Sequence, residues 1–276
     1  MGTIAAPAVE HYENFPVASW ILPRRYRTPV RLIYAFARLA DDIADEGDAS
    51  EDLRLAQLAE LQRELDRIQS GQAPTQPPFA QLAEVIGEYS LPIEPFRDLL
   101  SAFAQDVTKK RYADFGEVMD YCRRSANPIG RLLLHLYRET APRSLALSDG
   151  ICASLQIINF LQDIEIDYRK GRIYLPQDEM DRYGIGERQI AERDTGGLWS
   201  VFMHHQVERA RRMLQAGAPL ARVLKGRVGM ELRMIVLGGE RILKKLHEAG
   251  GDVFRHRPTL DRRDWIYMAV RALTAR

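Results

Sequence analysis

The stretch of sequence that decides the fold is Asn159-Phe160-Leu161-Gln162-Asp163-Ile164-Glu165-Ile166-Asp167. Asn159, Asp163 and Asp167 recur at every fourth position, so on an α-helix of about 3.6 residues per turn they form one polar stripe. The residues around this stripe are mostly apolar, which is typical of a helix in a protein interior. One amide and two carboxylates in such a place predict a site for a hard cation such as Mg²⁺, which takes oxygen ligands and leaves room for substrate phosphates.

A similar acidic stripe lies much earlier in the chain, in Asp41-Asp42-Ile43-Ala44-Asp45. We call Asp41, Asp42 and Asp45 the first acidic stripe, and Asn159, Asp163 and Asp167 the second. Carboxylates one turn apart repel each other, and two such pairs in one cavity raise one another's pKa unless cations neutralise them. Each stripe could instead be an ordinary solvated helix face, and this alternative is more open for the first stripe. If both bind Mg²⁺, the ions need a polyanion such as a diphosphate to complete their coordination.

Basic residues stand next to both stripes and are candidate ligands for a diphosphate. Arg38 precedes the first stripe by one turn, while Lys170 and Arg172 follow the second stripe in the sequence Arg-Lys-Gly-Arg-Ile-Tyr-Leu-Pro. For Lys170 and Arg172, the open alternative is that they complement the negative end of the preceding helix.

The composition excludes several classes of protein. The chain has 276 residues, a formal net charge of +1 and two cysteines, Cys122 and Cys152. The nearly balanced charge argues against a nucleic-acid partner, and two cysteines in apolar surroundings fit a reducing, cytoplasmic compartment. No zinc-like Cys/His spacing is present, and His204-His205 is an isolated pair that we expect at the surface rather than among metal ligands.

We expect no signal peptide at the N-terminus. The apolar runs, such as 151–161, are broken by polar residues before they reach the about 20 residues that cross a bilayer. Peripheral contact with the inner membrane surface stays open, and Arg255, Arg257, Arg262 and Arg263 are basic residues that could contribute to it.

Helical periodicity runs through almost the whole chain and predicts an all-α protein of one domain, residues 1–276. A first helix is expected to begin with Pro29 in its first turn and to end before Gly47. In the next helix, 51–68, we expect Leu53 among the buried residues. Further helices are predicted at 79–88, 93–109, 115–140, 144–168, 199–215, 217–249 and 260–274. Pro128 should kink the helix at 115–140, the stretch before Leu198 should be poor in helix, and no strand is expected.

An apolar helical cavity with Mg²⁺-held diphosphate suits the ionisation of an allylic diphosphate. The metal stabilises charge on the leaving group, apolar walls exclude water, and aromatic faces stabilise a carbocation. The candidate aromatic residues, each of which could equally be core packing, are Phe15, Tyr34, Phe36, Tyr121, Phe160 and Tyr174.

Four stretches together resemble the squalene and phytoene synthases, and the resemblance extends from Phe15 to Ala272. They are Tyr34-Ala-Phe-Ala-Arg38-Leu-Ala-Asp41-Asp42-Ile-Ala-Asp45, Tyr121-Cys122 with Ala126 and Gly130-Arg131-Leu132, Gln156 to Asp167, and Gly171-Arg172-Ile173-Tyr174-Leu175-Pro176. The resemblance implies an isoprenoid-synthase-type helical bundle around a central apolar cavity.

The same resemblance implies roles for individual residues. It implies Mg²⁺ sites at Asp41, Asp45, Asn159, Asp163 and Asp167, with Asp42 beside the first. It implies that Arg38, Lys170, Arg172 and Arg257 meet the diphosphate. It places Tyr121, as a catalytic residue, with Gln156 and Tyr174 on the cavity wall; Phe15 and Tyr34 are further candidates for substrate binding.

The sequence also departs from the family pattern. Where members commonly carry Ser-x-Ser-Phe, this chain has Tyr12-Glu13-Asn14-Phe15, and Glu13 is a poor neighbour for a phosphate. Gln162 stands where several relatives carry a basic residue. Asn127 precedes Pro128 in an otherwise apolar helix; it could orient a water molecule, or it could simply cap backbone groups that the proline frees.

The segments 13–23 and 125–131 resemble one bacterial branch of the family, the hydroxysqualene synthases of hopanoid pathways. That resemblance implies presqualene diphosphate as substrate, ionisation and rearrangement to a C30 cation, and capture by water without a nicotinamide cofactor. Two alternatives remain open. One is head-to-head condensation of two farnesyl diphosphates to presqualene diphosphate, squalene or dehydrosqualene, and the other is a non-catalytic scaffold with the same fold.

Overall fold

The computed structural model describes residues 21–274 and confirms the all-α class. The first half contains α1 (Arg24–Asp45), α2 (Glu51–Gln69), α3 (Pro77–Tyr89), α4 (Glu94–Thr108), β1 (Arg111–Tyr112), α5 (Phe115–Ser125) and α6 (Asn127–Leu136). The second half contains α7 (Pro142–Gln162), α8 (Ile164–Arg169), β2 (Ile173–Pro176), α9 (Gln177–Arg182), α10 (Glu187–Ala191), α11 (Trp199–Gly217), α12 (Leu220–Val223), α13 (Gly226–Glu248) and α14 (Arg262–Thr274).

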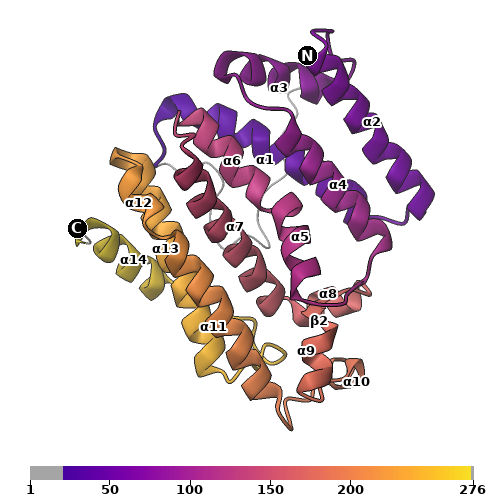
Figure 1. The fold of residues 1–276 in the computed structure, drawn as a ribbon, viewed down its shortest axis with the longest axis vertical. Coiled ribbons are helices and arrows are strands. Elements are labelled where there is room, and N and C mark those ends of the chain that lie inside the picture. The colour runs from indigo at the N-terminus through magenta and orange to yellow at the C-terminus, as the bar shows by residue number, and fades with distance from the viewer. Residues whose placement is uncertain (1–20, 275–276) are drawn as a thin grey trace.

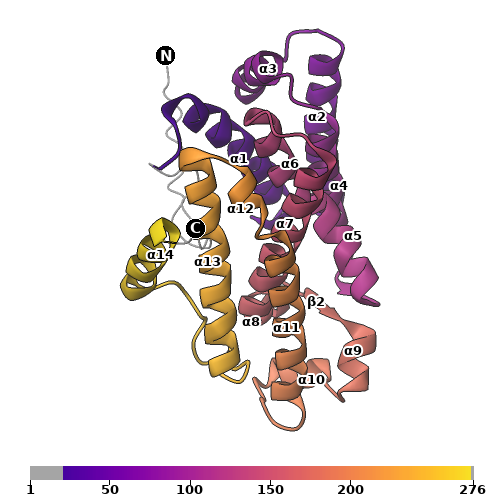
Figure 2. The ribbon, with the colours of Figure 1, turned by 60° about the vertical axis from the view of Figure 1, so that its left-hand side comes forward.

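Helix α7 runs through the middle of the bundle (Figure 1) and packs against α5, α6, α11 and α13. Helices α8, α9 and α10 gather with β2 at one end of the bundle, and α14 lies on the outside of α13 (Figure 2). This arrangement brings the end of α7, which carries the second acidic stripe, to the end of the bundle where the loop 169–176 begins.

The apolar side chains form two main buried clusters. One surrounds α7, α11 and α13 and includes the fully buried Ile158, Leu161 and Trp199. The other is built from α1 to α4. Helix α6 joins them, because Leu134 belongs to the first cluster and Leu132 to the second. Burial of apolar area in both clusters is the main stabilising contribution.

Helix α1 begins earlier than its sequence predicts. It starts at Arg24 after Pro23, so Pro29 lies inside the helix, and the prediction that Pro29 occupies the first turn was wrong. The added turn is held by one tertiary and one local contact: Tyr26 is buried with its ring 5.0 Å from that of Tyr137. Arg27 Nε also donates a hydrogen bond to the carbonyl of Leu22 at 3.0 Å. These contacts outweigh the helix bond that proline cannot make.

The predicted helix at 115–140 is two helices that meet at Ala126, so Pro128 does not kink a continuous helix. Ala126 has φ −117° and ψ −47°, and Pro128 falls in the first turn of α6, where its missing N–H costs nothing. Helix α6 then packs closely on α7, because a Cβ at Gly130 would clash with the side chains of Ser148 and Cys152.

Other differences from the predicted elements are smaller. The region before Leu198 contains the short helices α9 and α10, and the predicted helix at 217–249 is split into α12 and α13. β1 and β2 form a short parallel pair where no strand was expected. Leu53 is 51 % exposed rather than buried.

By length and composition, α7 is the one helix within residues 21–274 that could cross a membrane, contrary to the expectation that no apolar run would be long enough. Half of its apolar window is buried in the bundle. Its packing against α5, α6, α11 and α13 makes it the central core helix of this fold.

Candidate active site

The two acidic stripes meet at one end of the bundle, although about 120 residues separate them in sequence. Arg172 Nη2 donates a hydrogen bond to Asp45 Oδ1, and Lys170 Nζ lies 3.3 Å from Asp45 Oδ2. The loop that follows the second stripe is therefore tied to the last turn of α1. The charge of Asp45 also contributes to a raised pKa at Asp167.

Asp163 lies at a junction between two helices, where a single helix was predicted for 144–168. It is both the C-cap of α7 and the N-cap of α8, with φ −106° and ψ 16°. The stripe survives this break: the N–H of Asp163 donates to the carbonyl of Asn159 at 2.9 Å, and the N–H of Asp167 donates to that of Asp163 at 2.8 Å. The three oxygen-bearing side chains thus keep the one-turn spacing that the sequence predicted.

Burial and repulsion between carboxylates raise the pKa of one carboxyl group in each stripe. Burial, followed by the charge of Asp45, raises the pKa of Asp41 to about 7. Burial, followed by the charge of Asp163, raises the pKa of Asp167 to about 8. A divalent cation would relieve this repulsion and displace the protons. The donor set consists of carboxylate and amide oxygens, so it fits Mg²⁺ chemically.

Protein cations already neutralise part of this charge. Arg257, from the segment after α13, donates two hydrogen bonds to Asp163, from Nε to Oδ1 at 2.5 Å and from Nη2 to Oδ2 at 3.1 Å. Arg38 is about half exposed and lies between two carboxylates of the first stripe, with Nε 2.9 Å from Asp42 Oδ1 and Nη1 3.4 Å from Asp41 Oδ2. All four predicted diphosphate ligands, Arg38, Lys170, Arg172 and Arg257, therefore contact carboxylates of the stripes.

Asp106 is a residue of the site that the sequence did not predict. It is 3 % exposed, and its Oδ2 accepts a hydrogen bond from Tyr121 Oη, while its Oδ1 accepts one from Tyr174 Oη at 2.9 Å. Arg172 Nη1 donates to Tyr174 Oη at 3.0 Å, so a continuous chain of polar contacts runs from Asp106 to Asp45. Burial raises the pKa of Asp106 to about 6, against the opposing effect of the Tyr121 hydrogen bond.

A sequence signal for Asp106 did exist. In the predicted helix 93–109, Asp106 follows Leu99 and Phe103 at the spacing of one helix face, and both of these are buried. A carboxylate on the apolar face of a helix needs a partner. Its two tyrosine partners could not be identified without the fold, because they come from α5 and β2.

Aromatic rings form one wall beside the second stripe. Phe160 and Tyr174 stack with centroids 3.9 Å apart and planes 6° apart, and Tyr121 lies 5.4 Å from Tyr174. A narrow space, too small to hold a water molecule, lies where this wall meets the stripe. Its lining residues are Phe160, Ile164, Asp167, Arg172, Ile173, Tyr174 and Leu175. This narrow space therefore has an aromatic side and a charged side.

The other residues predicted to line the cavity lie in different parts of the structure. Phe36 packs in the other core cluster, with its ring 5.2 Å from that of Phe96, so it is core rather than cavity wall. Tyr34 is partly buried against the same cluster, and Gln156 is half-buried on α7. Phe15, together with the preceding residues 12–14, lies outside the described part of the chain.

Asn127 is the first residue of α6 and is 6 % exposed. Its Oδ1 accepts no hydrogen bond from any group within residues 21–274. A buried amide oxygen without a donor costs about 1–3 kcal/mol, so this atom favours binding of a donor such as water.

Comparison with known proteins agrees with this geometry. The family model for squalene/phytoene synthase matches residues 8–264. A hydroxysqualene synthase from Rhodopseudomonas palustris is 39 % identical over 236 residues, which cover 85 % of this chain and 79 % of that protein. A hydroxysqualene synthase from Sinorhizobium fredii is 34 % identical over 241 residues, covering 87 % of this chain and 81 % of that protein.

Solved structures share the architecture. Squalene synthase HpnC from Alicyclobacillus acidocaldarius superposes with a TM-score of 0.80 at 35 % identity, covering 87 % of this chain and 90 % of that chain. A dehydrosqualene synthase in complex with a ligand gives a TM-score of 0.83 at 22 % identity, with 92 % and 88 % covered. The second likeness concerns the fold alone.

Proposed function

The chain belongs to the squalene/phytoene synthase family, and we propose that it converts presqualene diphosphate and water to hydroxysqualene and diphosphate. In this proposal the chain is a single domain, because α6 joins its two core clusters. The observation that carries the proposal is the meeting of two acidic stripes beside an aromatic wall, with Arg172 in contact with both Asp45 and Tyr174. The hydroxysqualene synthases that are 34–39 % identical over most of both chains support the choice of substrate.

Six residues of the stripes would hold Mg²⁺: Asp41, Asp42, Asp45, Asn159, Asp163 and Asp167. Bound Mg²⁺ supplies the positive charge that stabilises a departing diphosphate. Arg38, Lys170, Arg172 and Arg257 bind the diphosphate oxygens in this proposal, because guanidinium and ammonium groups form charge-assisted hydrogen bonds with phosphate. These cations therefore pair with the carboxylates before substrate binds and with the diphosphate afterwards.

The aromatic wall has two tasks in this proposal. The faces of Phe160, Tyr121 and Tyr174 lie beside the developing carbocation and stabilise it electrostatically. Burial and the charge of Asp106 raise the pKa of both tyrosines well above the ordinary value, so both phenols stay protonated. A neutral phenol is a far weaker nucleophile than a phenolate, so the wall does not trap the cation.

Ionisation breaks the C–O bond to diphosphate; water capture then forms one C–O bond and releases one proton, which the departed diphosphate takes up. We assign Asn127 as the residue that orients this water, supported by its burial and by its unoccupied Oδ1 acceptor within the described residues. An Asn127 oxygen that accepts one water hydrogen directs a water lone pair elsewhere, which is the positioning that nucleophilic capture requires. The product is then an alcohol, and no hydride donor is consumed.

A direct assay tests this function. The purified protein is incubated with presqualene diphosphate and Mg²⁺ in the absence of NADPH, and hydroxysqualene is expected as the product. Recovery of unchanged substrate with well-folded protein would refute the proposal. The protein with Asp163→Ala is the control and should yield little alcohol.

Head-to-head condensation of two farnesyl diphosphates is the second candidate, supported by the 35 % identity to a solved squalene synthase. Farnesyl diphosphate alone, with Mg²⁺, distinguishes it: formation of presqualene diphosphate or a C30 hydrocarbon would support condensation. A scaffold without catalysis predicts that the wild type and Asp163→Ala bind Mg²⁺ and a diphosphate analogue equally.

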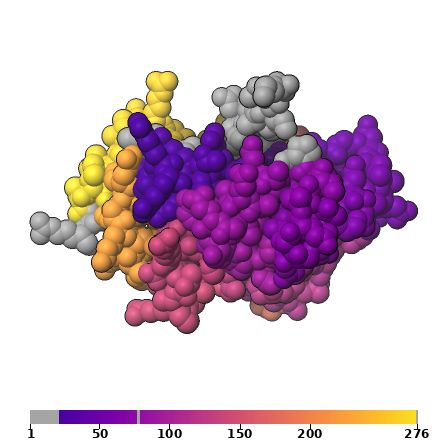
Figure 3. Space-filling view, turned by 90° about the horizontal axis from the view of Figure 1, so that it is seen from above, coloured from indigo at the N-terminus to yellow at the C-terminus, as the bar shows by residue number. Residues whose placement is uncertain are grey.

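We also propose that α14 rests on an anionic membrane surface, where a C30 substrate and product would partition. Its exposed apolar residues Ile266, Val270 and Leu273 share one helix face at 55–70 % exposure. The helix lies at the edge of the molecule (Figure 3), with Arg262 and Arg263 at its start. Apolar residues beside arginines are typical of helices that lie in a membrane interface. Arg257 does not belong to this surface, because it pairs with Asp163.

A further inference from the structure

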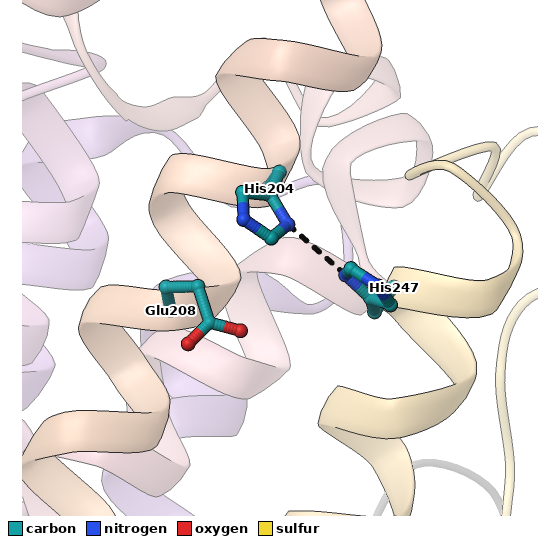
Figure 4. Close-up of side chains that lie close together, drawn as sticks. All are labelled: His204, Glu208 and His247. Carbon is teal, nitrogen blue, oxygen red and sulfur yellow. Dashed lines mark hydrogen bonds between the residues drawn. The ribbon is translucent and has the colours of Figure 1, made fainter.

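A histidine pair links α11 to the last turn of α13. His204 Nδ1 and His247 Nδ1 lie 3.0 Å apart, and Glu208 follows His204 by one turn of α11 (Figure 4). One possible ligand atom from each of the three residues lies within 4.8 Å of the other two. The expectation that the His204-His205 pair is isolated was wrong for His204, because packing of α11 on α13 brings up a histidine 43 positions away.

The geometry suits a tetrahedral transition-metal ion. With Zn–N bonds of about 2.0–2.1 Å, two nitrogen ligands at tetrahedral angles lie about 3.3 Å apart, so the observed separation needs only a small adjustment. His204 and Glu208 share one helix face because of their i, i+4 spacing. Both histidines are exposed and Glu208 is half-buried, so an ion from solvent can reach all three.

Glu208 is paired with Arg211 and could exchange this partner for a metal ion. Its Oε1 is bound by Arg211 Nη1, and the Nε atom of Arg211 lies 3.5 Å from Glu240 Oε2. Arg211 therefore keeps a carboxylate partner when Glu208 turns toward a metal. The anionic charge of Glu208 then offsets one of the two positive charges of the ion.

We propose that His204, Glu208 and His247 form a binding site for a divalent transition-metal ion of the Zn²⁺ type, with water completing its coordination. Two imidazoles and one carboxylate are ligands that Zn²⁺ favours, whereas Mg²⁺ prefers oxygen alone. The site is thus chemically distinct from the two acidic stripes, and Mg²⁺ does not compete for it.

The bound ion fixes the end of α13 to α11. Directly after this end, Gly250 and Gly251 have φ of 59° and 76°, and Trp199 Nε1 donates to the carbonyl of Gly251 at 3.0 Å. The chain then reaches Arg257, which binds Asp163 of the second stripe. A metal at this position therefore stabilises the turn from which the Arg257 segment departs.

Calorimetric titration of the whole protein with Zn²⁺, in buffer with saturating Mg²⁺ to occupy the stripes, tests the site. We expect one Zn²⁺ bound per chain in the wild type, and an affinity at least tenfold lower in His204→Ala, His247→Ala and Glu208→Gln. The matched control is His205→Ala, since His205 neighbours His204 in sequence but contacts Arg209 instead. This control should bind Zn²⁺ like the wild type.

Two further readouts separate specific binding from loose surface binding. Co²⁺ should give the intense visible absorption of a tetrahedral ion in the wild type and in His205→Ala, but not in His247→Ala. Zn²⁺ should raise the melting temperature of the same two proteins only. Equal Zn²⁺ affinity of the wild type and the His204→Ala/His247→Ala double variant, or no affinity in the wild type, overturns the proposal; circular dichroism verifies that each variant is folded.

Discussion

Arg257 binds the carboxylate of Asp163 through two N–H groups, at 2.5 and 3.1 Å, although 94 residues separate the two. The pair joins the segment after α13 to the junction of α7 and α8. It also sets a competition, because Asp163 is a proposed Mg²⁺ ligand and Arg257 a proposed diphosphate ligand. Before substrate binds, Arg257 and Asp163 are paired with each other, so neither is free for its proposed ligand.

Replacing Arg257 by Gln should have opposite effects on metal and on substrate. Asp163 loses its cationic partner, so Mg²⁺ affinity of the substrate-free protein should rise several-fold. Diphosphate loses a charge-assisted partner, so kcat/KM should fall by about 10- to 100-fold. Calorimetry and steady-state kinetics measure the two effects. Arg255→Gln is the control, because Arg255 is 82 % exposed and pairs with Asp252; unchanged Mg²⁺ affinity in Arg257→Gln would count against the competition.

Asp167→Asn should stabilise the metal-free protein at pH 8. A pKa raised to about 8 in the folded state, above 3.8, means that the folded protein binds this proton more tightly than the unfolded chain. The free energy of unfolding therefore falls as pH rises from about 4 to about 8, and Asn removes this loss. Because solvent partly screens the Asp167 carboxylate, we expect the free energy of unfolding to increase by only about 1–2 kcal/mol at pH 8, and this gain should vanish near pH 4.

Urea unfolding in EDTA at several pH values measures this difference. Asp178→Asn, on the exposed face of α9, serves as the control and should show no comparable dependence on pH. A destabilised Asp167→Asn at pH 8 would mean that the carboxylate is well satisfied in the folded protein, contrary to the proposed electrostatic strain.

Asp106→Asn should weaken both stability and catalysis. The amide of Asn has one oxygen where the carboxylate has two, so one of the two tyrosine hydroxyls loses its acceptor. We expect a loss of about 1–3 kcal/mol in the free energy of unfolding. We also expect kcat to fall about tenfold with little change in KM, since the tyrosines contact the hydrocarbon rather than the diphosphate. Tyr112→Phe is the control, because Tyr112 Oη accepts from Gln105 rather than donating to Asp106; a KM effect alone would contradict the assignment.

Asn127→Leu should change the product. Without an acceptor to orient water, the cation should lose a proton instead, so the share of alcohol should fall at least severalfold in favour of hydrocarbon. Product analysis by gas chromatography measures the ratio. Ser125→Ala removes a buried hydroxyl that also has no hydrogen-bond partner among residues 21–274, and it should leave the ratio unchanged. The same alcohol at the same rate from folded Asn127→Leu would exclude a role in capture.

Ile266→Glu/Leu273→Glu should reduce binding to vesicles that contain anionic lipid at least tenfold, because two charges replace the apolar face of α14. Activity on detergent-solubilised substrate should be retained. Val201→Glu, at a residue of α11 that is 53 % exposed, is the matched control. Equal vesicle binding by both variants would place the membrane contact elsewhere on the protein or exclude it.

The sequence predicted the helices and the two stripes because these depend on local periodicity. Spacing of four places Asn159, Asp163 and Asp167 on one face, even though the helix breaks at Asp163. The breaks at Ala126 and Asp163, and the added turn before Pro29, depend on tertiary packing and carry no comparable local signal. For the same reason the partners of Asp106 and the approach of His247 to His204 could not be deduced from sequence.

The short parallel pair of β1 and β2 has a consequence for how the site tolerates change. Side chains two positions apart point to the same side of extended backbone, which lets Arg172 and Tyr174 meet over Asp106. Arg111 Nη1 donates to the carbonyl of Gly171 at 2.6 Å and so anchors the loop just before β2. A substitution at Leu175 keeps this alternation, whereas one inserted residue between Arg172 and Tyr174 would turn the phenol away. In this loop, length is under stricter constraint than composition.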